Sequence, residues 1–271
     1  ARGALATLRS LPPGQLEAGV TAVSAGNHAI ATAFAAQALG TTARVVMIRT
    51  ANPSRVASCR AYGAEVVLAQ DVHEAFEMAE RIRQDEGRFF VHPFEGPHVA
   101  CGTGTLGLEI CEQVKDFDAL IVPIGGGGLI AGVANAVKQL RQDCSVIGVE
   151  PEGADTMHRS FARGEPQSIE SVTTIADSLG APFALPYSFA LAASNVDQLV
   201  RVSDEQLQRT MGFLFRTMRI AVEPACAASS AALWWPLRDS LRGKRVVLVM
   251  CGSNIDWETF ASQAIFDDGI D

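Results

Sequence analysis

The sequence has few lysines, no paired cysteines and no long apolar run, and each of these absences excludes a class of protein. It has three lysines, no arginine-rich stretch and a net charge of −8, so nucleic acid is not expected as a partner. The six cysteines form no C-x-x-C motif, which argues against zinc and is typical of free thiols in the cytoplasm. With no recognisable signal peptide and no apolar run of roughly 18 residues, we expect neither secretion nor a membrane span.

What remains is the composition of a globular α/β protein. Apolar residues make up 48% of the 271 residues and charged residues 19%, which is enough for a sizeable core. Short apolar runs alternate with helical patterns, as expected for parallel sheets flanked by helices in two lobes. The expected strands span 20–23, 44–48, 65–68, 89–91, 118–123, 145–150, 197–202 and 244–250, and the expected helices span 1–8, 28–39, 53–62, 72–86, 99–114, 129–140, 207–217 and 224–237, with a last helix near Trp257.

Two stretches interrupt this alternation. The prolines Pro12 and Pro13, followed by Gly14, are expected to break the first helical pattern. Residues 164–186 have little periodicity and many small and polar residues. A connection of this length is usually functional or mobile, so we expect a loop there.

Four consecutive glycines, Gly125, Gly126, Gly127 and Gly128, stand between a buried strand and a helix. Glycine loses the most conformational freedom on folding, so such a run needs a reason. Bare amides at a helix N-terminus, with the helix dipole behind them, form an anion site. The alternative is a tight turn, for which one or two glycines would be enough. We therefore predict phosphate binding at this turn.

Two other strand-to-helix turns combine small residues with polar groups: residues 24–28 (Ser-Ala-Gly-Asn-His) and residues 251–254 (Cys-Gly-Ser-Asn). Ligands of parallel sheets bind at the carboxyl ends of strands, so the three turns could hold one ligand with a phosphate and a second polar part. Taken singly, Ser24 and Asn27 have a simpler interpretation as a helix cap. The simpler interpretation of Cys251 is that of a small buried residue.

One alternative depends on the glycine turn alone. Gly126, Gly128 and Ala131 fit the G-x-G-x-x-A form of the dinucleotide fingerprint, and Glu150 ends the next strand, where an acid binding a ribose would lie. This pattern predicts a nicotinamide-dependent oxidoreductase. It leaves the fourth glycine and the two other polar turns without a role.

Together the three turns and residues 174–177 (Thr-Ile-Ala-Asp) resemble those of the fold-type II pyridoxal-phosphate enzymes, most of all the serine/threonine dehydratase and serine racemase-like group. The resemblance covers nearly the whole chain. It implies a two-lobed fold similar to the tryptophan synthase β subunit. Residues 1–22 and 98–271 would form a large cofactor-binding domain that lacks its N-terminal part, and residues 23–97 a small domain that closes over the substrate.

The resemblance also implies where the Schiff-base lysine lies. The family has this lysine in a Ser-x-Lys-x-Arg-Gly-Ala stretch, and the chain opens with Ala1, Arg2, Gly3 and Ala4. The lysine is therefore expected immediately before Ala1, and no catalytic residue is assigned within the chain itself. A natural protein without this lysine would be a non-catalytic relative.

Carried over by position, each turn receives a role. Cys251 would face the pyridine nitrogen of the cofactor. A thiol with a pKa near 8.5 cannot hold a proton there as a carboxylate would, so rapid loss of a β-hydroxyl is favoured over long-lived carbanion chemistry. The other cofactor-binding residues would be Asn27, Gly125, Gly126, Gly127, Gly128 and Leu129, and the substrate-binding residues Ser24, Ala25, Gly26, His28 and Asp177.

The implied activity is that of a pyridoxal-phosphate-dependent dehydratase, which converts a β-hydroxy amino acid such as threonine or serine to a 2-keto acid and ammonia. Racemases of this group use a serine at the position of Ala25, which disfavours racemisation. Thr103 and Ser178 also depart from the family pattern, near the expected substrate pocket. A racemase and a β-replacing synthase remain as alternatives.

Some relatives also bind a divalent cation. The matching ligands here would be Glu150 and the Ala154 carbonyl, but Thr156 stands where an acid is required and Asp155 is one position away. This set of ligands is incomplete, so a bound divalent cation is not the favoured expectation. A homodimer or homotetramer is expected from the resemblance, with a small amino acid as the substrate.

Overall fold

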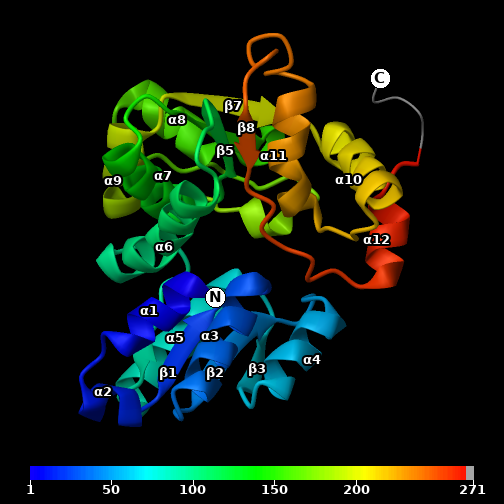
Figure 1. Cartoon of the computed structure of the whole chain (residues 1–271). Helices are drawn as coiled ribbons and strands as arrows, with labels where there is room; N and C mark the ends of the chain where they lie inside the picture. The colour runs from blue at the N-terminus through cyan, green and yellow to red at the C-terminus, as the bar shows by residue number, and fades with distance from the viewer. Residues whose placement is uncertain (267–271) are drawn as a thin grey trace. The chain divides into compact units, whose positions relative to one another are not determined.

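The computed structural model describes residues 1–266. Helices and strands alternate along them, and the chain divides into two compact units, Ala1–Gly102 (unit 1) and Thr103–Asp271 (unit 2). Each unit contains one four-stranded parallel sheet with helices on its faces (Figure 1). No helix within the described residues is long and apolar enough to span a bilayer.

Unit 1 has the strand order β3-β2-β1-β4. All its strand pairs are parallel. Its elements are α1 (Arg2–Arg9), α2 (Pro13–Glu17), β1 (Val20–Val23), α3 (Asn27–Ala38), β2 (Ala43–Ile48), α4 (Pro53–Ala61), β3 (Glu65–Ala69), α5 (Val72–Glu86), β4 (Phe89–Phe90) and the start of α6 (Pro97–Gln113).

The two faces of this sheet bury different side chains because successive residues of a strand point to opposite sides. Val45 and Met47 pack in one apolar cluster with residues of α1 and α3. Val46, between them, packs in another cluster with Ala75 and Ala79 of α5. The continuous apolar run of β2 is therefore that of a strand buried on both faces.

Unit 2 repeats the same strand order, β7-β6-β5-β8, again with parallel pairs throughout. Its first strand thus lies between its second and its fourth, as in unit 1. Its elements after α6 are β5 (Ala119–Pro123), α7 (Gly128–Leu140), β6 (Ser145–Pro151), the 3-10 helix η1 (Glu152–Ala154), α8 (Thr156–Arg163), the 3-10 helix η2 (Asp177–Leu179), α9 (Pro186–Asn195), β7 (Gln198–Val202), α10 (Asp204–Met218), α11 (Pro224–Trp234), β8 (Val246–Leu248) and α12 (Trp257–Gln263).

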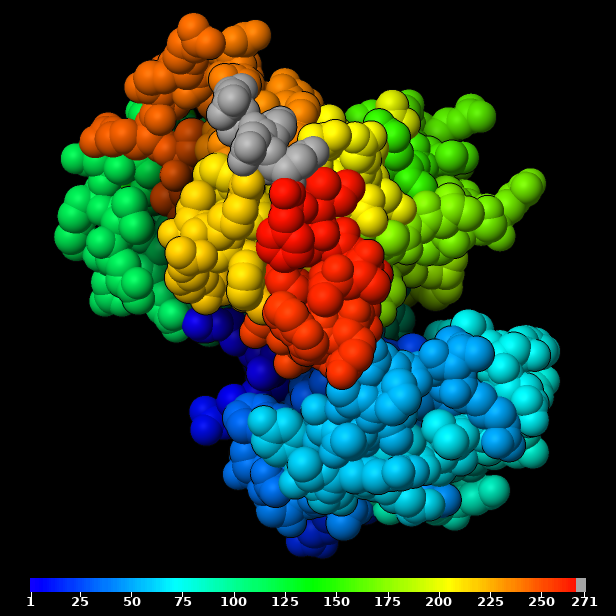
Figure 2. All heavy atoms as spheres, turned by 90° about the vertical axis from the view of Figure 1, so that its right-hand side faces the viewer, coloured from blue at the N-terminus to red at the C-terminus, as the bar shows by residue number. Residues whose placement is uncertain are grey.

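Helices cover both faces of this sheet as well. Ile121 and Ile147 pack in one cluster with the alanines of α11 and with α10, whereas Leu120 and Val146 pack in another with α7 and α9. Figure 1 shows α7 and α9 on one side of the strands and α10 and α11 on the other. Past α12 the chain returns to α10, where the Ile265 amide donates to the Gln208 carbonyl at 3.0 Å. In Figure 2 the red atoms of α12 and of the residues just after it cover part of α10.

The α/β class and every expected strand are confirmed, with bounds that shift by a few residues. The sequence reasoning missed three helices, α2, α8 and α9. Both α2 and α9 begin with a proline at the first helical position, where the missing amide costs nothing. Pro13 was therefore wrongly interpreted as only a break. The start of α8 depends on the side chain of Glu150, as described below.

The division into units differs from the predicted domains at both ends of unit 1, which also includes residues 1–22 and 98–102. Residues 1–22 were assigned to the large domain, but Ala4 and Leu8 of α1 pack in the same apolar cluster as Ala29 and Ala33 of α3. In addition, Val20 already belongs to a strand of the unit 1 sheet. A small domain of residues 23–97 that closes over the substrate stays a prediction.

Candidate functional site

The strand order puts one turn of each unit at a topological switch point. In unit 1 the chain crosses from β1 to β2 on one side, while β4 lies on the other side of β1. In unit 2 the chain crosses from β5 to β6 on one side, while β8 lies on the other side of β5. Ligands of open parallel sheets bind outside the carboxyl ends of strands at such a point. The turns in question are residues 24–26 after β1 and residues 124–127 after β5. Two of the three turns singled out from the sequence thus lie where a ligand is expected.

The turn after β5, here called the glycine turn (residues 125–128), leaves little room for a side chain at Gly125 and Gly127. Gly127 has a φ of +89°, in the left-handed region that favours glycine, and an added Cβ would lie 2.5 Å from the Cε of Met157. At Gly125 an added Cβ would lie 3.1 Å from the Cα of Leu179. Gly127 is also the N-cap of α7 and has no side chain with which to accept the first amides. The start of α7 is therefore bare backbone.

Helix α6 contacts the glycine turn and packs closely against α7. The hydroxyl of Thr103 donates to the Gly128 carbonyl at 2.8 Å. An added Cβ at Gly107 would lie 2.7 Å from the Val133 carbonyl oxygen, so the backbones of α6 and α7 are in close contact. The sequence reasoning treated Thr103 only as a departure from a family pattern and missed this role. The glycines at 104 and 107 were the available signal for close helix packing.

The turn after β8 lies beside the glycine turn. Because β8 pairs with β5, their carboxyl ends share one edge of the sheet. Although Cys251 is exposed overall, burial of its thiol raises the pKa to about 12, with the nearby Cys226 and Glu223 acting in the same direction. Glu223 is close by, since an added Cβ at Gly252 would lie 2.6 Å from its Oε1. Cys251 therefore holds its proton at neutral pH.

The predicted substrate segment also reaches the glycine turn. Asp204 of α10 holds it by accepting a hydrogen bond from the Thr174 hydroxyl at 2.5 Å and another from the Ile175 amide at 3.0 Å. An added Cβ at Gly125 would lie 3.2 Å from the Ser178 carbonyl oxygen. Asp177, next to Ser178, is exposed. Unit 2 thus places Ser178, the neighbour of Asp177, against Gly125, and a substrate role for Asp177 stays a prediction.

In unit 1 the turn after β1 carries polar side chains. The Ser24 hydroxyl accepts the Gly26 amide at 3.1 Å, which leaves its own proton to donate elsewhere. Gly26 is the N-cap of α3 and Asn27 its first residue. His28 Nε2 lies 2.8 Å from the Val91 carbonyl oxygen, which can only accept, so Nε2 carries the proton. Burial lowers the pKa of His28 to about 4, and the ring is therefore neutral at pH 7.

An aromatic pair adjoins this turn, and the sequence reasoning did not place it there. His92 and Phe94 follow β4, the neighbour of β1, and their ring centroids are 4.7 Å apart in an edge-on arrangement. His92 Nδ1 accepts the amides of Phe94 and Glu95 at 3.2 and 3.0 Å. The strand order, which was not assigned from the sequence, is what brings His92 to this edge.

Glu150 has a structural role that weakens two of the alternatives. It is 1% exposed, and its two oxygens accept the amides of Met157 at 2.8 Å and of His158 at 2.7 Å, near the start of α8. Burial raises its pKa to about 8. A carboxyl group buried and hydrogen-bonded in this way is not available to ribose hydroxyls, as a dinucleotide site would require. Within residues 1–266 no group of three or more His, Cys, Asp and Glu side chains could hold a metal ion.

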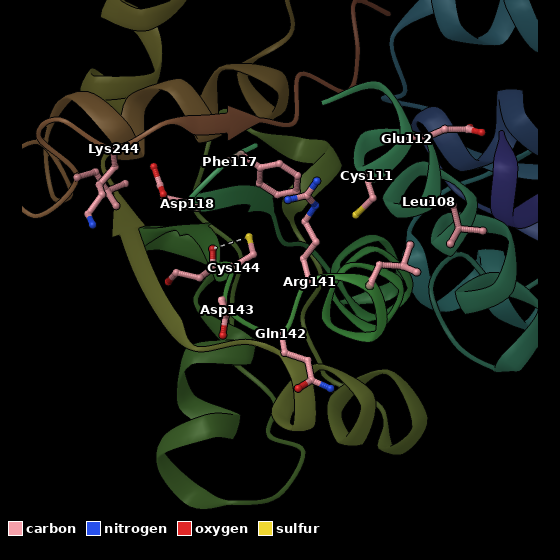
Figure 3. A pocket seen from close by; sticks show the side chains of 14 residues that line it. Leu108, Cys111, Glu112, Phe117, Asp118, Arg141, Gln142, Asp143, Cys144 and Lys244 are labelled. Atoms are coloured by element: carbon pink, nitrogen blue, oxygen red, sulfur yellow. Dashed lines mark hydrogen bonds between the residues drawn. The ribbon is translucent and has the colours of Figure 1, made fainter. Parts of the chain in front are cut away.

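A cavity in unit 2 lies away from these turns. It has a volume of about 1040 Å³ and is lined at the amino ends of β5 and β6, by residues such as Ala119 and Ser145 (Figure 3). Arg141 covers the ring of Phe117 there, at 5.1 Å from the ring centroid. The predicted cofactor residues of unit 2 are at the opposite, carboxyl edge of the sheet. This cavity is therefore not the predicted site.

Comparisons with known proteins agree with the geometry of the two turns. Residues 1–252 match the family model described as pyridoxal-phosphate dependent enzyme. The chain is 56% identical over 261 residues to a phenylserine dehydratase of Ralstonia pickettii, covering 96% of this chain and 80% of that protein. It is 40% identical to an L-threonine ammonia-lyase of Thermotoga maritima, of which it covers 63%.

Solved structures give the same picture. Maize serine racemase superposes with a TM-score of 0.91 at 32% identity, covering 96% of this chain and 80% of the racemase chain. The processed form of threonine deaminase isoform 2 from Solanum lycopersicum superposes with a TM-score of 0.91 at 33% identity, covering 96% of this chain and 77% of the deaminase chain. The fold-type II architecture predicted from the turns is confirmed.

Proposed function

Since the chain belongs to the family of pyridoxal-phosphate-dependent enzymes, we propose that it is a dehydratase that converts a β-hydroxy amino acid to a 2-keto acid and ammonia. The observation that carries the proposal is the bare start of α7 at a switch point, where Gly127 leaves the first amides without a side-chain cap. The relatives named as a dehydratase and an ammonia-lyase support the reaction type. The nicotinamide alternative is wrong at the level of the family.

The glycine turn fits the phosphate of the cofactor. An added Cβ would collide with Met157 at Gly127 and would be tightly packed against Leu179 at Gly125, so backbone amides are what these positions can offer an anion. The amides of Gly125, Gly126, Gly127, Gly128 and Leu129 would hold the phosphate. When bound, the cofactor supplies an electron sink for negative charge on the substrate α-carbon. The protein supplies binding, orientation and charge.

The turn in unit 1 would bind the polar parts of the ligands. Asn27 would hydrogen-bond the pyridoxal hydroxyl. The Ser24 hydroxyl, whose oxygen already accepts the Gly26 amide, would donate its proton to the substrate carboxylate. The amides of Ala25 and His28 lie at a helix N-terminus, which favours an anion, whereas Gly26 would contribute by holding Ser24 in place through its amide. Asp177 of unit 2 would contact the substrate as well.

Cys251 would lie against the pyridine nitrogen as a neutral thiol. With its pKa raised to about 12, it offers a weak hydrogen-bond donor and no charge. A ring without a charged partner withdraws electrons less strongly from the α-carbon. Fast loss of a β-hydroxyl suits such a site better than racemisation, and Ala25 has no proton to deliver from a second side.

Three finer points of the proposal concern substrate, assembly and location. The most similar relative that we report is named for phenylserine, so a β-hydroxy amino acid with an aryl group is the first substrate to test. Assembly as a homodimer or homotetramer and a cytoplasmic location belong to the proposal. So does the small domain of residues 23–97 that closes over the substrate.

A panel of β-hydroxy amino acids tests the function. The protein would be loaded with pyridoxal phosphate and given phenylserine, threonine, serine or 3-hydroxyaspartate, and keto acid and ammonia would be measured. Equimolar release of both from at least one substrate is expected. Inversion at the α-carbon without release would indicate a racemase, and a thioether product in the presence of added thiol would indicate a β-replacing synthase.

A further inference from the structure

A buried carboxylate with two arginine partners lies at the corner between β6 and α8. Asp155 is 5% exposed, and its Oδ1 accepts Arg159 Nε at 2.7 Å while its Oδ2 accepts an Arg201 guanidinium nitrogen at 3.0 Å. Arg159 lies one turn further along α8, and Arg201 lies on β7, opposite Glu150 of β6. We call these three residues the Asp155 clamp. It ties the start of α8 to the sheet.

The same corner holds a second buried carboxylate. Glu150 accepts the amides of Met157 and His158, so the first turn of α8 is bound to β6 through Glu150 and to β7 through the clamp. The Asp155 carboxylate is buried whereas its two arginine partners are about half exposed, so losing one guanidinium leaves a buried charge with a single partner. The position of α8 is therefore set by these contacts.

The first turn of α8 is in contact with the glycine turn. Met157 is fully buried, and its Cε lies 2.5 Å from where a Cβ of Gly127 would be. Met157 thus fills the space behind Gly127, and its own amide is the one that Glu150 binds. A shift of α8 would move Met157 and with it the support of the glycine turn.

The contacts at this corner do not suit a divalent cation. The oxygens of Glu150 and Asp155 are occupied by amides and guanidinium groups. Thr156, where relatives would have an acid, donates its hydroxyl proton to the Ala181 carbonyl at 2.7 Å. Hard divalent cations need several free oxygen ligands, and two fixed positive charges already stand here.

We propose that Arg159 and Arg201 are positioning residues for the phosphate site. Their guanidinium groups take the place of a divalent cation as the positive charges that hold Asp155. They hold Asp155, Asp155 holds α8, and Met157 of α8 supports the glycine turn. The proposal depends on the phosphate role of that turn. It makes the protein independent of divalent cations.

The test compares two ligands that differ only in the phosphate. Dissociation constants of pyridoxal phosphate and of pyridoxal would be measured by quenching of tryptophan fluorescence. For the double variant R159M/R201M we expect affinity for pyridoxal phosphate to fall about threefold to thirtyfold, the range by which packed networks change a distant site. Affinity for pyridoxal should stay as in the wild type. The exposed Arg163, at the end of the same helix, gives the matched control R163M, which should change neither constant.

Three results would contradict parts of the scheme, and they are distinguishable. Equal affinity of the double variant and the wild type for pyridoxal phosphate would refute the positioning role. Equal weakening of both ligands would show general damage and refute it too. A wild type that binds no pyridoxal phosphate would refute the proposed function itself. If the double variant does not fold, R201M alone serves, because Arg159 still holds one oxygen of Asp155.

Cation independence has its own measurement. The thermal midpoint of the wild type and its affinity for pyridoxal phosphate should be the same with EDTA, Mg²⁺ or Ca²⁺. A midpoint that falls with EDTA and returns with Mg²⁺ or Ca²⁺ would overturn this part of the proposal. No activity measurement is needed for either readout.

Discussion

The two units have the same strand order, but their switch-point turns differ in chemistry. In unit 1 the turn after β1 carries a serine hydroxyl and is followed by an asparagine at the start of α3, both half-buried. In unit 2 the turn after β5 has only glycines at the start of α7. Both helices begin after a glycine N-cap, unlike α4, α5, α10 and α12, which are capped by side chains.

The difference shows how one topology serves two kinds of ligand group. A phosphate has three equivalent oxygens and is bound well by backbone amides, which require that side chains be absent. A substrate must be distinguished from its analogues, which requires hydroxyl and amide side chains at defined places. A shared switch point provides the place, and the side chains of the turn decide what is bound.

The largest effect is expected where a side chain is introduced into the glycine turn. Gly127→Ala adds about 1–2 kcal/mol of left-handed backbone strain and a collision with Met157. Loss of one charge-assisted amide contact to phosphate, about 1.5–3 kcal/mol, would weaken cofactor binding about tenfold to a hundredfold. Cofactor titration and urea unfolding measure both effects.

Gly164→Ala is the matched control for that substitution. Gly164 has a φ of +76°, but nothing lies within 4 Å of an added Cβ. It should lose stability from strain alone and bind the cofactor as the wild type does. Equal cofactor affinity of Gly127→Ala and Gly164→Ala would mean that the glycine turn does not hold the phosphate.

A smaller effect is expected in unit 1 from Asn27→Ala. Removing one hydrogen bond to the pyridoxal hydroxyl should weaken cofactor binding about twofold to tenfold. Asn52→Ala is the control, because Asn52 caps α4 by accepting the Ser54 amide at 2.8 Å. It should lower the free energy of unfolding by about 1 kcal/mol and leave cofactor affinity unchanged. If Asn27→Ala lowered only the free energy of unfolding and Asn52→Ala weakened cofactor binding, Asn27 would not belong to the site.

The units should also respond to pH with opposite signs. The pKa of His28 falls from 6.5 to about 4 on folding, so its contribution is present above pH 6.5 and is lost as the pH falls towards 4. The pKa of Glu150 rises from 4.5 to about 8, so its contribution is present below pH 4.5 and is lost as the pH rises through 8. The effect is at most about 3 kcal/mol for His28 and at most about 5 kcal/mol for Glu150.

Hydrogen exchange at several pH values assigns each loss to a unit. Acid should weaken protection in unit 1, and mild alkali should weaken it in unit 2. Glu150→Gln should abolish the alkaline loss and leave the acid loss as it is. A loss of protection in unit 1 on the alkaline side would contradict the assignment.

The smallest effect is expected at Cys251. Its pKa of about 12 keeps the thiol neutral over the working range, and a serine hydroxyl is neutral there too. Cys251→Ser should therefore change the rate less than about twofold and leave the pH profile between about 6 and 9 unchanged, since no group that titrates near neutral pH is removed. Cys251→Asp should alter the absorbance of the bound cofactor, because it adds a charge. A profile that shifts in Cys251→Ser would show that the thiol ionises.

The part of the site that could be predicted is the part with one physical explanation. Four glycines in a row between a strand and a helix indicate an anion whatever the rest of the fold is. By contrast, Thr103 bonds Gly128, 25 residues away, and no local pattern predicts that contact. The start of α8 was missed for the same reason, because its amides are bound by Glu150 of β6. Strands were predictable because burial on both faces leaves a continuous apolar run, whereas the order of the strands was not.

The repeated strand order has a consequence for biosynthesis. In unit 1, Val20 of β1 pairs with Phe89 of β4, so this sheet can be complete while the ribosome still makes the second half of the chain. In unit 2, Ala119 of β5 pairs with Val246 of β8, which is synthesised much later than β5. Until then one edge of the fully buried strand β5 stays open to other chains. Chaperone dependence and aggregation during expression should therefore arise from unit 2.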